Sequence, residues 1–352
     1  MAFTLETLAQ IADAPFDDII DVRSPSEYAE DHVPGAISLP VLDDAERARV
    51  GTIYVQESRF LARKIGAALV ARNAAAHIEG PLADRDGGWK PLVYCWRGGQ
   101  RSGSFATILR QIGWQVEVLE GGYRSYRRAV VDAMYHAAFP APVIVLDGNT
   151  GTAKTDILGR LPGHGVQVID LEGLANHRGS LFGALGDQPS QKAFEGAIAL
   201  AAARLDPARP VVVEAESSKI GEVSIPPALW SAMKDAPRIH VEAPLPARAR
   251  FLASAYADVV ADPARLDTTL DRLVPLQGHD QVAEWKALAT EGAFESLAAS
   301  LMERHYDPRY HRQRARMEPR TEAPLPVESL DEGGREDAAA RIAALLAGLS
   351  KA

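Results

Sequence analysis

The sequence predicts an α/β protein made of two consecutive domains, each built on a largely parallel sheet. Short apolar segments alternate along the chain with helix-like stretches, which is the pattern of repeated strand–helix–strand units. With 352 residues, the chain is longer than one hydrophobic core usually organises. A Phe-Pro-Ala-Pro stretch at 139–142 interrupts both helix and strand patterns. We therefore expect one domain at 1–138 and a second at 139–352, the latter including a C-terminal helical segment.

The elements follow from the apolar pattern in chain order. Segments predicted as buried strands are 19–21, 92–94, 116–119, 143–146, 166–169, 211–213 and 239–241. Helical patterns fill the intervals between them, for example at 104–112 and 191–205. The Pro- and Glu-rich stretch 318–336 is predicted as an extended connection to a last, Ala-rich helix.

Composition excludes several classes of protein. No segment reaches the roughly 20 apolar residues of a membrane helix, and the N-terminus has no basic stretch before an apolar run, so we expect a cytoplasmic protein without a membrane partner. The net charge of −9 argues against nucleic-acid binding by the whole surface, although a local basic patch remains compatible with it. A single cysteine excludes an internal disulfide and a multi-cysteine zinc site. We expect no protein-held metal and no tightly bound cofactor.

The single cysteine, Cys95, directly follows a predicted strand and precedes a helical pattern. Residues 95–102 read Cys-Trp-Arg-Gly-Gly-Gln-Arg-Ser. The glycines let backbone N–H groups turn inward, and the helix N-terminus adds positive charge, which lowers a thiol pKa. Arg97 and Arg101 add cations, and the Arg101 fork suits an oxyanion. The loop favours a catalytic thiolate over a structural, buried cysteine.

A second loop follows the strand at 143–146 and leads into a helical pattern. Strand, glycine-containing loop, Lys-Thr and helix are the order of a P-loop, so the second domain is predicted to be P-loop NTPase-like. We expect a phosphate to bind at Gly148, Asn149, Thr150, Gly151, Thr152, Ala153, Lys154 and Thr155. Lys154 would reach the phosphate and Thr155 could hold Mg²⁺. Ala153 replaces the usual glycine, which costs about 1 kcal/mol if its φ is positive.

Four further side chains are candidates for acid, base or ligand contacts. Glu214 and Glu216 end the strand at 211–213 and share one face of an extended chain. One of them is expected to face the phosphate site, or else to form an exposed salt bridge. His177 and Arg178 lie in a polar, Gly-containing segment typical of a loop over a ligand. For His177 two interpretations stay open, a proton shuttle or a side chain that satisfies backbone groups.

Two stretches rich in arginine and tyrosine are candidate contacts to an RNA. RNA is recognised by cations and by rings that stack on bases, but a solvated helix face has the same composition. The residues concerned are Arg124, Arg127 and Arg128 in the first stretch, and Arg304, Tyr306, Arg309, Tyr310 and Arg312 in the second.

The N-terminal motifs resemble the rhodanese family, whose active cysteine carries sulfur. The motifs are Asp-Val-Arg at 21–23, His-Val-Pro-Gly-Ala at 32–36 and Tyr-Cys at 94–95 with its Gly-rich loop. The Cys-x5-Arg spacing is one residue longer than the commonest rhodanese loop and matches cysteine phosphatases of similar fold. Those enzymes usually carry His before the cysteine, where this chain has Tyr94. Phosphatase-like chemistry therefore stays open as an alternative.

Taken in order with the segments 170–180 and 213–221, both loops resemble those of the bacterial tRNA 2-selenouridine synthases over about 17–310. The resemblance implies a transferase that replaces sulfur by selenium at the wobble 2-thiouridine of tRNA, with selenophosphate as donor. It also implies geranyl transfer from geranyl diphosphate to the tRNA sulfur, giving a thioether that selenium displaces. The Lys154 loop would then hold a diphosphate, and the Cys95 loop would serve selenium transfer.

Two other hypotheses remain at this stage. A P-loop kinase or ATPase linked to a sulfur carrier would require Lys154 and Thr155 for ATP turnover. A non-enzymatic rhodanese-type module would bind phosphorylated ligands and would be indifferent to Cys95→Ser.

Overall fold

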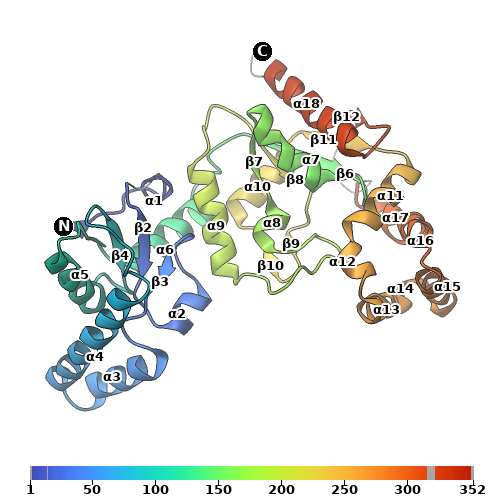
Figure 1. The fold of residues 1–352 in the computed structure, drawn as a ribbon. Helices are drawn as coiled ribbons and strands as arrows, with labels where there is room; N and C mark the ends of the chain where they lie inside the picture. The colour runs from blue at the N-terminus through green and yellow to red at the C-terminus, as the bar shows by residue number, and fades with distance from the viewer. Residues whose placement is uncertain (1, 14, 315–321, 350–352) are drawn as a thin grey trace. The chain divides into compact units, whose positions relative to one another are not determined.

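The computed structural model describes residues 2–13, 15–314 and 322–349, which form two compact units with one five-stranded parallel sheet each (Figure 1). The predicted α/β class is confirmed. The first unit contains Met1–Ala138 and Pro189–Arg204, and the second contains Phe139–Gln188 and Leu205–Ala352. The compact units differ from the expected boundary at one place, since Pro189–Arg204 lies with the first unit although we expected all of 139–352 in the second domain. The helix of this segment, α9 (Gln191–Ala203), packs against α1 and α6 of the first unit.

The first sheet has the strand order β1-β5-β4-β2-β3, all parallel. Its strands are β1 (Ala2–Phe3), β2 (Asp18–Asp21), β3 (Ile37–Ser38), β4 (Pro91–Tyr94) and β5 (Glu117–Leu119). Its other helices are α1 (Ala9–Ala12), α2 (Pro25–Glu30), α3 (Asp44–Gln56), α4 (Arg59–Glu79), α5 (Gln100–Ile112), α6 (Tyr123–Val131) and the π-helix η1 (Asp132–His136). Central strand β4 is buried along its whole length. Cys95, the residue after it, lies at the carboxyl-terminal edge of the sheet, where the strands of a parallel sheet lead into helices.

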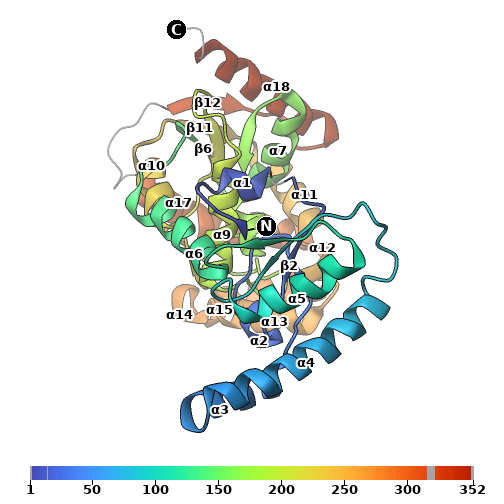
Figure 2. The same ribbon diagram turned by 90° about the vertical axis from the view of Figure 1, so that its left-hand side faces the viewer.

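Helices α3 and α4 pack against each other as a long pair, which Figure 2 shows beside α5. A capping box at Asp43 and a serine cap at Ser58 begin the two helices. Helix α4 also packs on α5, and α5 packs on β4 and β5. The first core therefore extends from the sheet through α5 to α4.

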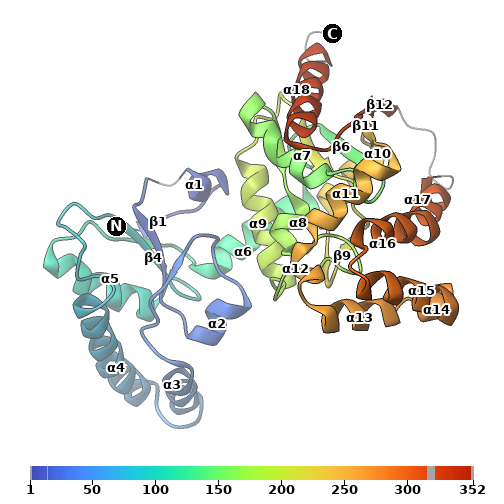
Figure 3. The same cartoon turned by 45° about the vertical axis from the view of Figure 1, so that its right-hand side comes forward.

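The second sheet has the strand order β12-β11-β6-β8-β7, again all parallel. Its strands are β6 (Val143–Gly148), β7 (Gln167–Ile169), β8 (Val211–Glu214), β11 (Arg238–Glu242) and β12 (Glu322–Pro326), and β9 (Lys219–Ile220) forms a small antiparallel hairpin with β10 (Val223–Ser224). Helices near this sheet are α7 (Lys154–Arg160), the 3₁₀ helix η2 (Leu161–His164), α8 (Leu171–Ala175), α10 (Pro227–Asp235) and α18 (Glu332–Leu349). Helices α7 and α18 lie side by side (Figure 3).

The edge strand β12 was not predicted. It lies inside the stretch that the sequence predicts as an extended connection, and it pairs in parallel register with β11 from Arg238↔Glu322 to Glu242↔Pro326. Pro324 and Pro326 cannot donate to a ladder, so such a strand is tolerated only at a sheet edge. The predicted Ala-rich helix after it is α18.

A helical region completes the second unit. It comprises α11 (Leu245–Ala255), α12 (Ala257–Val260), α13 (Pro263–Asp271), α14 (Val274–Gln277), α15 (His279–Thr290), α16 (Phe294–Leu301), the π-helix η3 (Met302–Tyr306) and α17 (Asp307–Arg314). These helices have a core of their own, with Trp285 fully buried at its centre. None of the described helices combines the length and hydropathy that a bilayer-spanning segment requires.

Candidate functional sites

Cys95 lies at the C-terminal end of β4 and is buried, with 3% of its surface exposed. The Ser102 hydroxyl donates to its Sγ at 3.1 Å. Burial opposes ionisation, but this bond, the backbone amides of Ser102 and Arg97 and the charge of Arg101 outweigh it, so the pKa of Cys95 is lowered. The loop after Cys95 therefore surrounds the sulfur with hydrogen-bond donors and positive charge that favour the thiolate.

The loop after Cys95 is held by the turn before α6. The Tyr123 amide donates to the Cys95 carbonyl at 2.8 Å, and the Arg124 amide donates to the Trp96 carbonyl at 3.2 Å. Gly122 has a φ of +59°, and a Cβ there would lie 2.2 Å from the Cys95 carbonyl oxygen. Only glycine permits this approach, so the turn at 121–122 is part of the thiol site.

The two arginines of this loop differ in their surroundings. The Arg101 guanidinium donates to both carboxylate oxygens of Glu27, at 2.7 and 3.3 Å. The expected Arg101–oxyanion contact would therefore compete with an existing ion pair, which the sequence did not indicate. Arg97 is exposed, and no ion-pair partner for it is found among the described residues. Arg97 is thus the cation of this loop that can meet an anion from solvent.

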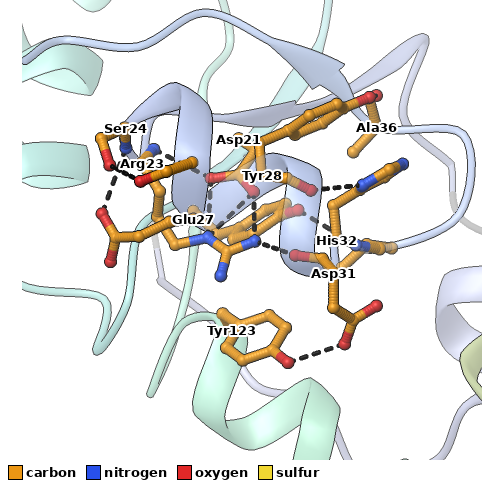
Figure 4. A network of polar contacts seen from close by, with 12 residues as sticks. Asp21, Arg23, Ser24, Glu27, Tyr28, Asp31, His32, Ala36 and Tyr123 are labelled. Atoms are coloured by element: carbon orange, nitrogen blue, oxygen red, sulfur yellow. Dashed lines mark hydrogen bonds and ion pairs between the residues drawn. The ribbon is translucent and has the colours of Figure 1, made fainter. Parts of the chain in front are cut away.

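A buried polar network lies beneath this loop (Figure 4). Arg23 donates to both carboxylate oxygens of Asp21 and, at 2.5 Å, to the Asp31 carbonyl oxygen. Its guanidinium carbon lies 4.1 Å from the centre of the Tyr123 ring, and the Tyr123 hydroxyl donates to Asp31 at 2.6 Å. The Asp-Val-Arg motif therefore positions Tyr123 and does not reach the sulfur itself.

The predicted phosphate loop connects β6 to α7. Ala153 has a φ of +59° and a ψ of +27°, so it occupies the left-handed region in which a Cβ is strained. Of the two cases considered for Ala153, a negative or a positive φ, the strained positive one therefore occurs. Arg248, which the sequence did not single out, donates to the Thr150 carbonyl oxygen at 2.9 and 2.7 Å and forms an ion pair with Asp307. Arg248 therefore fixes the backbone of the phosphate loop at Thr150.

The side chains of Lys154 and Thr155 are both engaged in hydrogen bonds. Lys154 Nζ donates to the Gly148 carbonyl at 2.9 Å, and the Thr155 hydroxyl donates to Glu172 at 2.7 Å. A cavity of about 400 Å³ opens here, lined by residues 150–156 and by side chains from α8, α11 and the segment after α8. It lies at the N-terminus of α7, and its lining combines the cations Lys154 and Arg178 with four acidic side chains, Asp156, Asp170, Glu172 and Glu216.

The two glutamates after β8 have separate environments. Glu214 is fully buried, accepts a hydrogen bond from the Leu171 amide, and has a pKa raised well above its ordinary value by burial and by Asp170. Glu216 lines the phosphate cavity, and burial together with the neighbouring Glu172 charge raises its pKa to about 8. Glu216 is therefore the glutamate of the pair that faces the cavity, and Glu172 joins it there.

Thr155 was named as a residue that could hold Mg²⁺ together with the phosphate. Among the described residues, no group of three or more His, Cys, Asp or Glu side chains is placed to hold a metal ion. The Thr155 hydroxyl is committed to Glu172.

His177 and Arg178 also differ from each other. His177 Nδ1 accepts a hydrogen bond from the Gly179 amide at 3.0 Å, and burial lowers the pKa of this histidine. This is the backbone contact that one of the two interpretations of His177 foresaw, and it engages Nδ1 and not Nε2. Arg178 lines the phosphate cavity, pairs with Asp258 at 2.9 Å and lies 4.8 Å from the centre of the Tyr256 ring.

An apolar cavity adjoins the phosphate cavity. The two share Thr150, Ser180, Leu252 and Tyr256, and the apolar one is otherwise lined mainly by Phe182 and side chains of α12, α13 and α16. Its volume is about 60 Å³, which is smaller than the ~150 Å³ cavity that takes benzene. The apolar cavity is therefore a narrow slot, and a ligand larger than benzene fits only if the slot widens.

The two arginine-rich stretches separate into inward and outward side chains. On α6, Arg124 and Arg128 are exposed, whereas Arg127 forms an ion pair with the buried Glu195 of α9. In the second stretch, Arg304 and Arg309 are exposed. Tyr306 lines the apolar cavity and Tyr310 the phosphate cavity, and the Arg312 side chain lies outside the described ones. The two tyrosines of this stretch therefore line cavities, whereas Arg304 and Arg309 face solvent.

Both units match known families. Residues 4–129 match the rhodanese-like domain, and residues 141–273 match the AAA domain of tRNA 2-selenouridine synthase. The tRNA 2-selenouridine synthase of Alcanivorax borkumensis is 37% identical over 246 residues, covering 68% of this chain and 66% of the relative. That of Chromohalobacter salexigens is 40% identical over 248 residues, covering 69% and 66%. The match therefore spans slightly less than two thirds of the length of these relatives.

Proposed function

Because the chain belongs to the tRNA 2-selenouridine synthase family, we propose that it is a tRNA-modifying transferase that replaces sulfur by selenium at C2 of the wobble 2-thiouridine. Selenophosphate is the selenium donor, and a geranylated 2-thiouridine is the intermediate. The first unit serves selenium transfer at Cys95, and the second binds the diphosphate of geranyl diphosphate. The cytoplasm is the compartment in which we place this reaction.

The observation that carries this proposal is the continuity of the phosphate cavity with an apolar slot. A nucleoside triphosphate needs a polar pocket for its sugar and base, whereas a prenyl diphosphate needs an apolar continuation of the phosphate site. The shared residues Thr150, Leu252 and Tyr256 lie where the two parts of such a ligand would join. A ten-carbon chain is longer than the present slot, so the helices that line it must separate when the ligand enters.

In the first step, the 2-thiouridine sulfur attacks C1 of geranyl diphosphate. A C–S bond forms, the C–O bond breaks, the diphosphate leaves with its electron pair, and the base loses its N3 proton. Lys154 and the amides of residues 150–155 compensate the charge of the leaving diphosphate. This role needs no nucleotide hydrolysis.

In the second step, selenium from selenophosphate bonds to C2 and geranyl thiolate leaves. Water then cleaves the Se–P bond and releases phosphate. The Cys95 site supplies a thiol of lowered pKa and the exposed Arg97 for the selenophosphate oxygens. We assign Cys95 to this step as the group that moves the proton: its thiol protonates the departing geranyl thiolate, and the resulting Cys95 thiolate takes a proton from the water that cleaves the Se–P bond.

The test is mass analysis of nucleosides from 2-thiouridine tRNA incubated with the protein, geranyl diphosphate and selenophosphate. Wild type should form 2-selenouridine, Cys95→Ser should accumulate the geranylated base, and Lys154→Ala should reduce geranylation at least tenfold. Thr107→Ala, a change on the exposed face of α5, is the matched control and should behave as wild type. An unchanged nucleoside profile with folded wild-type protein would overturn the proposal, and ATP turnover would then be measured.

A further inference from the structure

The thiol of Cys95 lies at the edge of an open cleft formed within the first unit. The cleft has a volume of about 970 Å³ and runs between the Cys95 loop and helix α3. Three arginines line it, Arg47, Arg97 and Arg101, and no acidic residue does. Glu27 pairs with Arg101 at 2.7 Å and with Arg47 at 3.5 Å, so three arginines and one carboxylate leave a surplus of two positive charges at this cleft. On a chain with a net charge of −9, this surplus favours an anionic ligand near Arg97.

Two aromatic rings of this cleft are left partly uncovered. Trp96 is 38% exposed and Tyr54 is 43% exposed. The Trp96 ring stacks on Tyr123, with centroids 5.2 Å apart and planes at 27°. Tyr54 has the Arg59 guanidinium 5.6 Å from its ring centre. Each ring therefore has a neighbour of its own chain and still presents surface to the cleft.

The Trp96 ring is the outer end of a stack that begins in the buried network. Arg23 lies over Tyr123 at 4.1 Å, the Tyr123 hydroxyl is held by Asp31, and Trp96 follows on Tyr123 (the first of these groups are shown in Figure 4). Ordering a side chain before binding removes part of the entropy cost of binding. A fixed, partly exposed indole at the end of such a stack is a platform for one more flat ring.

We propose that the cleft binds one unstacked pyrimidine nucleotide of an RNA loop, with its base stacked on Trp96 and its phosphates near Arg97 and Arg47. The inference rests on the proposed function, since it names where the wobble nucleotide of the tRNA would lie. Trp96 is adjacent to Cys95 in the chain, so a base on its exposed surface comes close to the thiol. Tyr54 bounds the opposite wall, from α3. Trp96 is a positioning residue in this arrangement.

The experiment uses the full-length protein and an anticodon stem-loop that carries 2-thiouridine. Near-ultraviolet irradiation of the bound thiobase should yield a crosslink within residues 95–97 or at Tyr54, as read by peptide mass spectrometry. Trp96→Ala should weaken stem-loop binding by about 5- to 150-fold, the range expected for loss of one base–aromatic stack, whereas Trp96→Phe should restore most of the affinity. Phe60→Ala removes a 77% exposed ring outside the cleft and should leave the affinity unchanged.

A second readout separates stacking from damage to the loop. The rate at which free Cys95 is alkylated should be the same in wild type and Trp96→Ala, while bound stem-loop should protect Cys95 only in wild type and Trp96→Phe. Selenouridine formation with crosslinks confined to other segments and equal affinity for all variants would overturn the inference and leave the proposed function intact. Crosslinking at Trp96 without any nucleoside conversion would instead support the cleft and overturn the proposed function.

Discussion

The hydrogen bond from Ser102 to Cys95 controls how readily the thiol ionises. The bond is 3.1 Å long, and it is the largest of the contributions that lower the pKa of Cys95 against burial. Helix α5 begins at Gln100, so Ser102 lies in its first turn and its position is set by the helix. The thiolate therefore depends on a residue that does not line the cleft beside Cys95.

Ser102→Ala should raise the pKa of Cys95, because the folded thiolate loses a donor while burial stays the same. The midpoint of the pH profile for alkylation of Cys95 by iodoacetamide should move to higher pH, and the rate at neutral pH should fall several-fold. Thr107→Ala removes a hydroxyl further along the same helix and should leave the profile in place. An unshifted midpoint in Ser102→Ala would show that the backbone amides and the Arg101 charge lower this pKa without the Ser102 hydroxyl.

The left-handed conformation of Ala153 strains the backbone. The strain amounts to about 1–2 kcal/mol for a residue with a Cβ, and part of it is offset because alanine restricts the unfolded chain more than glycine does. Ala153→Gly should therefore raise the free energy of unfolding of the second unit by about 0.5–1 kcal/mol. Urea denaturation measures this. Ala287→Gly, on the exposed side of α15, should have the opposite effect, lowering it by about 1 kcal/mol.

At the scale of elements, helix α6 divides its arginines between packing and surface. Arg127 contacts Glu195, which is 1% exposed, and Glu195 also accepts a hydrogen bond from Tyr135 at 2.6 Å. Arg124 and Arg128 are exposed one turn apart. The helix thereby attaches α9 to the first unit with one arginine and leaves two others for an anionic partner.

Replacing each arginine of α6 by alanine should separate these roles. Arg127→Ala leaves the Glu195 carboxylate buried without its cation and should lower the free energy of unfolding by about 3 kcal/mol. Arg124→Ala and Arg128→Ala should change stability by less than about 0.5 kcal/mol, while reducing the slope of log affinity for tRNA against log salt concentration by nearly one each. Denaturation and salt-dependent binding of the three variants test this assignment. Equal salt slopes in all three would contradict the surface role.

At the scale of the whole molecule, the two units have separate cores, and the proposed function gives them separate ligands. The first core extends from its sheet to α4, and the second unit has one core that extends from its sheet to α18 and another in its helical region. A ligand that binds one folded unit stabilises that unit alone, by about 2.7 kcal/mol at a hundred times its Kd. Two unfolding transitions are therefore expected for the full chain.

Inorganic pyrophosphate should raise the midpoint of one transition and leave the other in place. Lys154→Ala should abolish the shift, whereas Cys95→Ser should retain it, because Cys95 belongs to the other unit. Scanning calorimetry with and without pyrophosphate measures both transitions. A shift of both transitions by the same amount would mean that the two units unfold as one.

Local patterns were sufficient for most elements and for both loops. The apolar segments around Leu92, Val145 and Val212 became central strands because a run of apolar residues is stable only when both faces are covered. The cysteine loop and the Lys-Thr loop were found because their chemistry lies within eight consecutive residues each. Strand β12 was not predicted, since its two prolines are acceptable only at an edge that pairing with β11 creates.

By itself, the sequence determined the α/β class, the two loops and the family to which they belong, because each of these depends on residues that are close in the chain. Tertiary structure alone decided the partners of single side chains. It paired Arg101 with Glu27 and Arg127 with Glu195. It also directed the Tyr306 and Tyr310 side chains toward cavities and placed Tyr54 opposite Trp96 across the Cys95 cleft. These contacts join residues tens of positions apart, and packing rather than local preference selects them.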